Sequence, residues 1–375
     1  MNELSFRIYG ILSDNLGRNL SIQNSQELIR EKYGGTTYKN TYNKIQELAG
    51  KEILKLDRIG RSSIASLNFE NHAIPDLLSE MEFKKKRRLS EKRQELQLLL
   101  FDMENYFSQG FYFIESISII NPEKNFKLNK AEFLFLLKEP LPTGTGNKLD
   151  SIEERERSIE NEIKSIYSLM KLLQDTHNIK LDFLILREEK EFFELLKEQE
   201  SNALKEMLSD KTAFYSPQDF WLSIKRALDL GIQIQAEKEF KLNKISEKDL
   251  FYNLNRFGYT EFGEKLQAGT NISIESTITA ILLQGDARRK EAIPIILAKA
   301  FDNKTKRKPN YRLLIFLCGR YGKLPELLGL LKALNKIKPL GETEKAINLI
   351  EQLDIKEKKA DLSSLKEKMR LYNAI

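Results

Sequence analysis

The first seventy residues contain three helical patterns followed by one hairpin pattern, and this order limits the folds that the chain can adopt. Apolar residues recur at helical spacing in three segments, at residues 4–16, 25–33 and about 37–49. Ser25 and either Thr36 or Thr37 are suitable N-caps for the second and third helices. Residues 53–69 then form two strand patterns joined by a turn that contains Gly60.

This order of elements is typical of a winged helix-turn-helix, here expected over residues 1–80. Such a module presents its third helix to the major groove of DNA and its hairpin to the flanking backbone. Tyr38, Ile45 and Leu48 are expected on the buried face of the third helix. The outward side chains suit contacts with base edges and phosphates, and two arginines flank the hairpin turn. The residues expected to bind double-stranded DNA are Thr37, Lys39, Asn40, Asn43, Lys44, Arg58 and Arg61.

The densest basic run of the chain follows the predicted hairpin. It consists of Lys84, Lys85, Lys86, Arg87 and Arg88. We expect it at the start of a basic linker helix over residues 81–108 that becomes apolar from Leu96 onward. As an exposed arm it would contact phosphates and add sequence-independent affinity for nucleic acid. The alternative is a solvated helix face, which is what charge runs usually form.

Composition excludes several other classes of protein. The chain has 375 residues and a net charge of +6, from 61 basic and 55 acidic residues, a modest excess that permits nucleic-acid binding without proving it. Its single cysteine, Cys318, excludes an internal disulfide and a cysteine zinc site. Because the chain has only two histidines, far apart in the sequence, we do not expect a metal centre built on histidines. No apolar run reaches the roughly 18 residues of a membrane span, and no signal-peptide pattern opens the chain. We therefore expect a cytoplasmic protein with no membrane partner.

The middle of the chain, residues 109–230, predicts a mixed α+β domain. Its patterns follow the order strand, strand, helix, strand, helix, helix. Strands are expected at residues 110–120, 131–138 and 181–186, and helices at 151–176, 189–209 and 217–229. Residues 240–375 are almost wholly helical in pattern, with Ser246 and Ser276 as expected N-caps. The fold class expected for the whole chain is α+β multidomain with a helical C-terminal domain.

The middle domain resembles the minimal nucleotidyltransferase domains that archaea often fuse to a winged helix. The resemblance covers residues 105–228. It rests on the strand pair 110–120 and 131–138, on the strand LDFLIL, and on the run EFFELLKEQESNALKEMLSDKTAFYSPQDFW, which is similar to the tail of those domains. The resemblance implies a Gly-Ser turn that approaches a nucleoside triphosphate. It also implies two carboxylates one residue apart and a third on the next strand, which together bind Mg²⁺.

The chain departs from this family pattern at the catalytic positions. The Gly-Ser position reads as Glu-Ser or Ile-Ser, at residues 115–116 or 117–118. The paired carboxylates correspond to Glu132 and Leu134, so the second is lost, and Asp182 matches the third. We therefore expect a degenerate scaffold, a pseudoenzyme without a cofactor. The alternative is a nucleotidyltransferase in which Glu132 and Asp182 hold Mg²⁺ and a nucleoside triphosphate.

These patterns together predict a DNA-binding protein, a transcriptional regulator or an antitoxin-like factor. Winged helices commonly bind paired half-sites as dimers, so a homodimer is also expected. Two alternatives stay open. One is the Mg²⁺-dependent nucleotidyltransferase, and the other is an RNA- or ribosome-associated factor that uses the same basic surfaces. A protein partner is also possible on either view of the winged helix.

Overall fold

The computed structural model describes residues 2–138, 148–237, 241–260, 268–285, 287–302, 308–359 and 364–375, and the structural statements below concern these residues. The chain combines many helices with a mixed sheet, so the expected α+β class is confirmed at this level. It divides into two compact units. The first unit comprises residues 1–155, 173–199 and 204–239, and the second comprises residues 156–172, 200–203 and 240–375.

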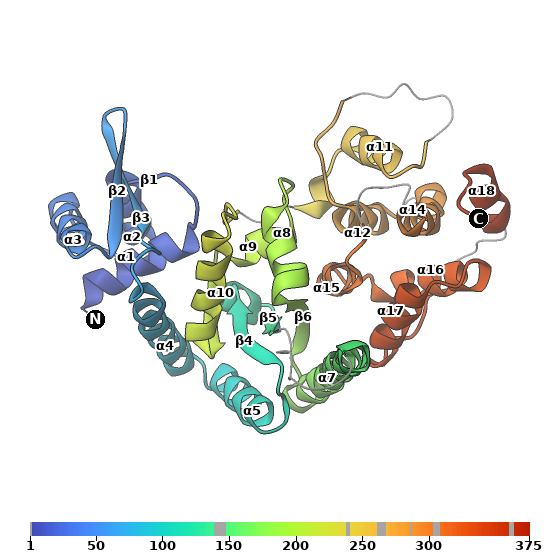
Figure 1. Cartoon of the computed structure of the whole chain (residues 1–375), viewed down its shortest axis with the longest axis horizontal. Helices are drawn as coiled ribbons and strands as arrows, with labels where there is room; N and C mark the ends of the chain where they lie inside the picture. The colour runs from blue at the N-terminus through green and yellow to red at the C-terminus, as the bar shows by residue number, and fades with distance from the viewer. Residues whose placement is uncertain are drawn as a thin grey trace. The chain divides into compact units, whose positions relative to one another are not determined.

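The first unit begins with three helices and a small antiparallel sheet (Figure 1). In chain order these are α1 (Glu3–Asp14), β1 (Leu20–Ser21), α2 (Ile22–Tyr33), α3 (Tyr38–Gly50), β2 (Leu54–Ile59) and β3 (Ser62–Leu67), with strand order β1-β3-β2. Thr37 caps α3, as one of the two expected residues. The expected cap of α2 was wrong, because the short strand β1 leads directly into the helix. Ser21 is therefore the cap, and Ser25 is buried inside α2.

Two helices, α4 (Ile74–Lys92) and α5 (Gln94–Gly110), replace the single linker helix expected over residues 81–108. The break falls at Arg93, whose backbone is extended. The basic run therefore lies within α4 and not at the start of a helix, which corrects that expectation. Helix α4 packs against both β7 (Lys211–Tyr215) and α10 (Pro217–Asp229), so it joins the N-terminal helices to the larger sheet of the same unit.

The larger sheet has four strands in the order β6-β5-β4-β7. The three not yet introduced are β4 (Ile114–Ile120), β5 (Lys130–Leu137) and β6 (Lys180–Arg187). Strands β5 and β6 are parallel, whereas β4 is antiparallel to both β5 and β7. From Ala131 to Leu137 every residue of β5 is buried, so this strand is covered on both faces. Its own Phe133 and Phe135 pack edge to face on Phe214 and Phe107.

The helices around this sheet differ from expectation mainly in one segment. The chain forms the short helices α6 (Pro122–Phe126), α8 (Phe193–Lys197) and α9 (Ala203–Met207), and a π-helical turn at Glu188–Phe192. It also forms the long α7 (Lys148–His177), of which residues 156–172 belong to the second unit. The single helix expected over residues 189–209 was wrong, because the π-helical turn, α8 and α9 divide it. Helix α10 begins and ends where the sequence pattern predicts and buries the only tryptophan of the chain, Trp221.

A close backbone approach fixes the loop after α1. Gly17 has a φ of +72°, and a Cβ atom at this position would lie 1.7 Å from the carbonyl oxygen of Ile234. The Ala236 amide donates to the Leu16 carbonyl at 2.8 Å, and the Arg18 guanidinium donates to the Ala236 carbonyl at 2.7 Å. The segment after α10 therefore docks on this loop only because residue 17 has no side chain.

The second unit is helical in its described part. It contains a 3₁₀ turn at Leu242–Lys244, then α11 (Glu247–Arg256), α12 (Ile274–Gln284), α13 (Ala287–Lys290), α14 (Ala292–Phe301), α15 (Tyr311–Arg320), α16 (Leu324–Ile337), α17 (Gly341–Glu351) and α18 (Leu365–Leu371). Ser246 caps α11 as expected, but the cap of α12 is Ser273 and not Ser276. Cys318 is buried, and burial raises the pKa of its thiol to about 12. Among the described residues, none of the helices combines the length and the apolar character that a bilayer crossing requires.

Candidate nucleic-acid interface

Helix α3 exposes a polar face with two stacked tyrosines. Its buried face carries Ile45 and Leu48, as expected. Tyr38 was wrongly expected on that face: its side chain is 51% exposed and stacks on Tyr42, with ring centroids 6.0 Å apart. Tyr38 is the first residue of α3, directly after the N-cap Thr37. The exposed face thus offers aromatic rings beside amides and ammonium groups.

The residues expected to read DNA differ in how far their side chains are engaged within the protein. Lys39, Asn40 and Asn43 are exposed on α3. The Thr37 hydroxyl, in contrast, accepts a hydrogen bond from the backbone N–H of Asn40 at 3.3 Å, and this bond caps α3. Lys44 forms an ion pair with Glu47 at 2.7 Å. Thr37 and Lys44 therefore already have intramolecular partners.

The β2–β3 hairpin holds its two arginines at the tip. Arg58 lies opposite Ser63 in the antiparallel register, and Arg61 directly follows the turn residue Gly60, whose φ of +60° suits glycine. Ile59, also at the tip, is 54% exposed. Among the described residues, no carboxylate forms an ion pair with either arginine, nor with Lys39 on α3. We call Lys39, Arg58 and Arg61 the unpaired cations of this surface.

The basic run in α4 is not a free cationic arm, which corrects the expectation for it. Each of its five side chains faces a carboxylate. The pairs are Lys84 with Glu80, Lys85 with Asp14 and Glu82, Lys86 with Glu104, Arg87 with Glu91, and Arg88 with Glu3. The Lys85 side chain is only 10% exposed, so it is a buried structural cation. This run therefore contributes far less positive field than its sequence indicates.

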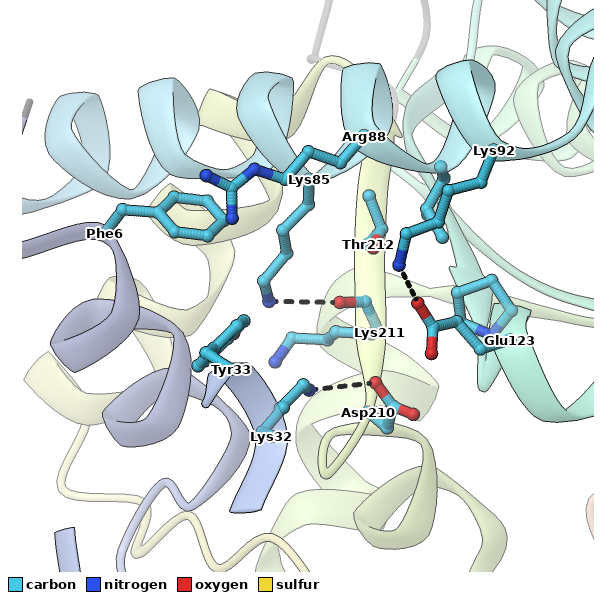
Figure 2. Close-up of a pocket in the computed structure, with 12 residues that line it drawn as sticks. Phe6, Lys32, Tyr33, Lys85, Arg88, Lys92, Glu123, Asp210, Lys211 and Thr212 are labelled. Atoms are coloured by element: carbon cyan, nitrogen blue, oxygen red, sulfur yellow. Dashed lines mark hydrogen bonds and ion pairs between the residues drawn. The ribbon is translucent and has the colours of Figure 1, made fainter. Parts of the chain in front are cut away.

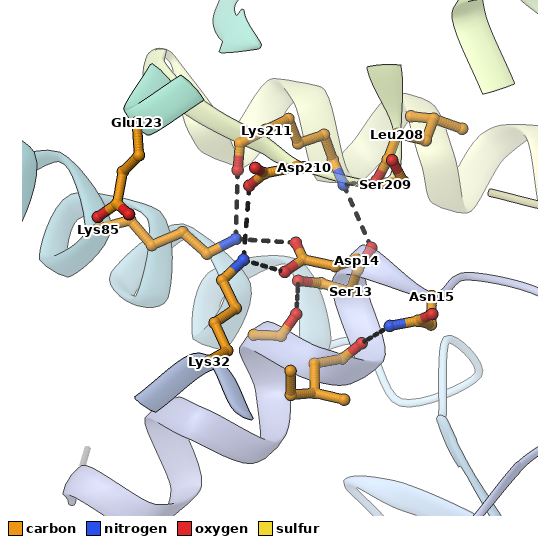
Figure 3. A network of polar contacts seen from close by, with 12 residues as sticks. Ser13, Asp14, Asn15, Lys32, Lys85, Glu123, Leu208, Ser209, Asp210 and Lys211 are labelled. Carbon is orange, nitrogen blue, oxygen red and sulfur yellow. Dashed lines mark hydrogen bonds and ion pairs between the residues drawn. The ribbon is translucent and has the colours of Figure 1, made fainter. Parts of the chain in front are cut away.

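Lys85 belongs to a buried network of charges between α1, α2, α4 and β7 (Figure 3). The Asp14 carboxylate forms ion pairs with the ammonium groups of Lys32 at 2.8 Å and Lys85 at 3.3 Å. The ammonium group of Lys211 donates to the carbonyls of Ser13 at 3.2 Å and of Leu208 at 3.0 Å. Because Asp14 and Lys211 are both almost fully buried, the network depends on their mutual compensation.

The pKa values in this network follow from burial and from the balance of charges. Burial lowers the pKa of Lys211 to about 8. Burial also acts to lower the pKa of Lys85, but the surrounding negative groups, Asp14 and Glu82 first among them, together outweigh burial, and the pKa is raised. Burial acts in the same way to raise the pKa of Asp14, yet Lys85 and Lys32 hold that pKa below its ordinary value. Among the lysines of the network, Lys211 is thus the one with the pKa nearest to neutral pH, while burial raises the pKa of the Glu82 carboxyl.

The low pKa of Lys211 predicts a pH-dependent stability. The unfolded chain holds this proton up to about pH 10.5, whereas the folded protein releases it near pH 8. Between these values the unfolded state binds more protons, so raising the pH favours folding. We expect Lys211→Met to lack this increase in stability with pH. Between pH 8 and pH 10 the free energy of unfolding should therefore rise by about 1–3 kcal/mol more in the native protein than in the variant. Urea unfolding at several pH values measures the difference, and parallel pH profiles would contradict the assignment.

The two carboxylates that the resemblance assigns to a metal site lie side by side. Glu132 on β5 pairs in register with Asp182 on the parallel strand β6, and both are buried. Lys130 and Lys180 precede them by two residues, on the same face of the sheet. The Lys130 ammonium lies 2.7 Å from Glu132 and 3.6 Å from Asp182, and Lys180 lies 3.0 Å from Asp182. Burial raises the pKa of Asp182 above its ordinary value.

This arrangement does not fit Mg²⁺ and a triphosphate. The two ammonium groups already neutralise the two carboxylates, and the position of the missing carboxylate is the buried Leu134. The residues at the expected Gly-Ser turn, among them Ser116 and Ser118, lie inside β4 and are buried, so no loop approaches a phosphate there. Within the described part of the chain, no three His, Cys, Asp or Glu side chains gather as metal ligands.

No protein family, curated protein or solved structure that we compared matches this chain. The assignment of a function therefore rests on the geometry of its own residues.

Proposed function

We propose that this protein binds duplex DNA through a winged helix-turn-helix formed by α1 to α3 and the β2–β3 hairpin. The observation that carries the proposal is the set of unpaired cations, Lys39, Arg58 and Arg61, on α3 and at the hairpin tip. A helix that enters the major groove and a hairpin that contacts the flanking backbone need cations at these two places. Asn40 and Asn43 share the exposed face of α3, where amides suit base edges.

We propose a role as a transcriptional regulator or an antitoxin-like factor, because the described residues of the middle domain do not form the metal site that the resemblance implies. Its strand β5 is covered on both faces, and its two candidate metal ligands are neutralised by lysines. In this proposal the middle domain is a scaffold that supports the DNA-binding module and has no catalytic role. Binding of structured RNA in preference to duplex DNA is the outcome that would replace this proposal.

The test is DNA binding by an Arg58→Gln/Arg61→Gln variant. We expect duplex affinity near physiological salt to fall about tenfold or more, because two phosphate contacts are lost. The dependence of log K on log salt is expected to become shallower by about 1.8, which is 0.9 for each contact. Fluorescence anisotropy with random duplex, single-stranded DNA and structured RNA at several salt concentrations measures both quantities.

The matched control is Arg87→Gln, which removes an exposed arginine that is paired with Glu91 on α4. We expect its affinity and salt slope to match those of the native protein. Equal losses in the hairpin variant and the control would mean that net charge, and not this surface, governs binding. An unchanged affinity of the hairpin variant for duplex DNA would refute the proposed interface.

A further inference from the structure

A small pocket opens where α1, the end of α2, α4 and the start of β7 meet (Figure 2). Its volume is about 160 Å³, below the roughly 300–1,000 Å³ of pockets for drug-sized ligands. Five of its twelve lining residues carry basic side chains, namely Lys32, Lys85, Arg88, Lys92 and Lys211. Only two lining residues, Asp210 and Glu123, carry carboxylates. This excess of cations favours an anionic occupant.

The two carboxylates of the lining lie toward solvent and hold their partners weakly. Glu123 is 62% exposed and pairs with Lys92, which is 65% exposed. Asp210 is 43% exposed and contacts Lys32 at 3.4 Å. Exposed ion pairs of this kind contribute only about 0–1 kcal/mol. An entering anion would therefore gain Lys92 at little cost, and it would meet Lys32 as a cation whose main partner is the buried Asp14 carboxylate at 2.8 Å.

The inner cations are held in place before any ligand arrives. Lys85 is fixed by Asp14 at 3.3 Å and by the carbonyl of Lys211 at 3.3 Å. The Arg88 guanidinium lies over the Phe6 ring, 4.2 Å from its centroid. Groups that are ordered in advance lose little conformational freedom when an anion binds.

We propose that this pocket binds a small molecule through a phosphate group. Lys32, Lys85 and Lys92 would surround the phosphate oxygens, and charge-assisted hydrogen bonds to such oxygens are among the strongest in proteins. Phe6 and Tyr33, whose rings meet edge to face with centroids 6.0 Å apart, form an apolar wall for a small substituent. The pocket is distinct from the surface of α3 and the hairpin tip, so the proposal stands apart from DNA binding.

Titration calorimetry with inorganic phosphate and phenyl phosphate tests this proposal. We expect saturable binding of both at pH 8, with phenyl phosphate the tighter ligand because of the apolar wall. Lys32→Gln and Lys92→Gln each remove a cation at the solvent side, and each is expected to weaken binding about tenfold. The matched control is Lys197→Gln, which removes an exposed lysine paired with Glu194 elsewhere in the same unit. Its affinity should equal that of the native protein.

A proton readout separates a site near Lys211 from general charge attraction. An anion beside Lys211 favours the protonated form of this lysine, so the protein should take up protons when phosphate binds at pH 8. The number of protons is obtained by comparing the binding enthalpies in buffers with different enthalpies of ionisation. In Lys211→Met this uptake should disappear. Absence of saturable binding, or equal affinity in the two pocket variants and the control, would overturn the proposal. A further pair of results would also overturn it: duplex DNA displaces phosphate, and the pocket variants bind DNA more weakly. The pocket would then be a contact for the DNA backbone.

Discussion

Replacing Asp14 with alanine is expected to lower the free energy of unfolding by about 3–5 kcal/mol. The Asp14 carboxylate is 5% exposed and is paired with Lys32 at 2.8 Å and Lys85 at 3.3 Å. Its removal would leave Lys85 and Lys211 with the carboxylate of Glu82 and the more exposed one of Asp210 as their acidic neighbours. Removing one partner of a buried charge pair leaves an uncompensated charge, and this accounts for the size of the effect.

Urea unfolding followed by the fluorescence of Trp221 measures this change. Trp221 is the only tryptophan and lies beside the network, with the Lys211 ammonium 4.8 Å from its ring, so its signal reports the first unit. The control is Asp210→Ala, which removes a 43% exposed carboxylate that contacts the same Lys32. We expect that change to cost less than about 1 kcal/mol. Similar losses in both variants would show that the network does not stabilise the fold as argued.

The elements that the sequence predicts well are those set by local pattern. Helix α3, with a cap expected at Thr36 or Thr37, and the hairpin around Gly60 follow from apolar spacing and turn chemistry within a dozen residues. The two-residue strand β1 was missed because it exists only through pairing with β3, more than forty residues away. The π-helical turn at Glu188–Phe192 likewise has no local signature.

The basic run shows why charge patterns are weak guides to a surface. Its residues are adjacent in sequence, but two of the carboxylates that pair with them, Asp14 with Lys85 and Glu3 with Arg88, belong to α1. No single-sequence pattern places Glu3 or Asp14 beside a helix some seventy to eighty-five residues later. Arg58 and Arg61, in contrast, lie at a hairpin tip, where no described carboxylate forms an ion pair with them.

The carboxylate pair was predictable in part. The positions of Glu132 and Asp182 indicated a shared site, and the parallel register brings them together. The lysines two residues earlier on each strand were visible in the sequence, yet their meaning depends on that register. The phosphate pocket left no pattern at all, since Lys32, Lys92 and Lys211 come from three separate elements.

Replacing Gly17 with alanine is expected to destabilise the first unit by about 2–5 kcal/mol. A Cβ atom 1.7 Å from the carbonyl oxygen of Ile234 forces the two backbones apart. This separation would break the hydrogen bonds of Ala236 with Leu16 and Arg18, each worth about 0.5–1.5 kcal/mol or more. A left-handed backbone adds roughly 1–2 kcal/mol for any residue with a side chain. The same tryptophan-detected urea unfolding measures the sum.

Gly60→Ala is the matched control because it separates backbone strain from the clash. Gly60 also has a left-handed φ, +60°, but an added Cβ there meets no atom within 4 Å. Its cost should be the conformational strain alone, about 1–2 kcal/mol. The excess in Gly17→Ala therefore measures how strongly the segment after α10 is docked on the loop after α1. Equal costs at the two glycines would mean that this segment moves aside freely and contributes little to the stability of the unit.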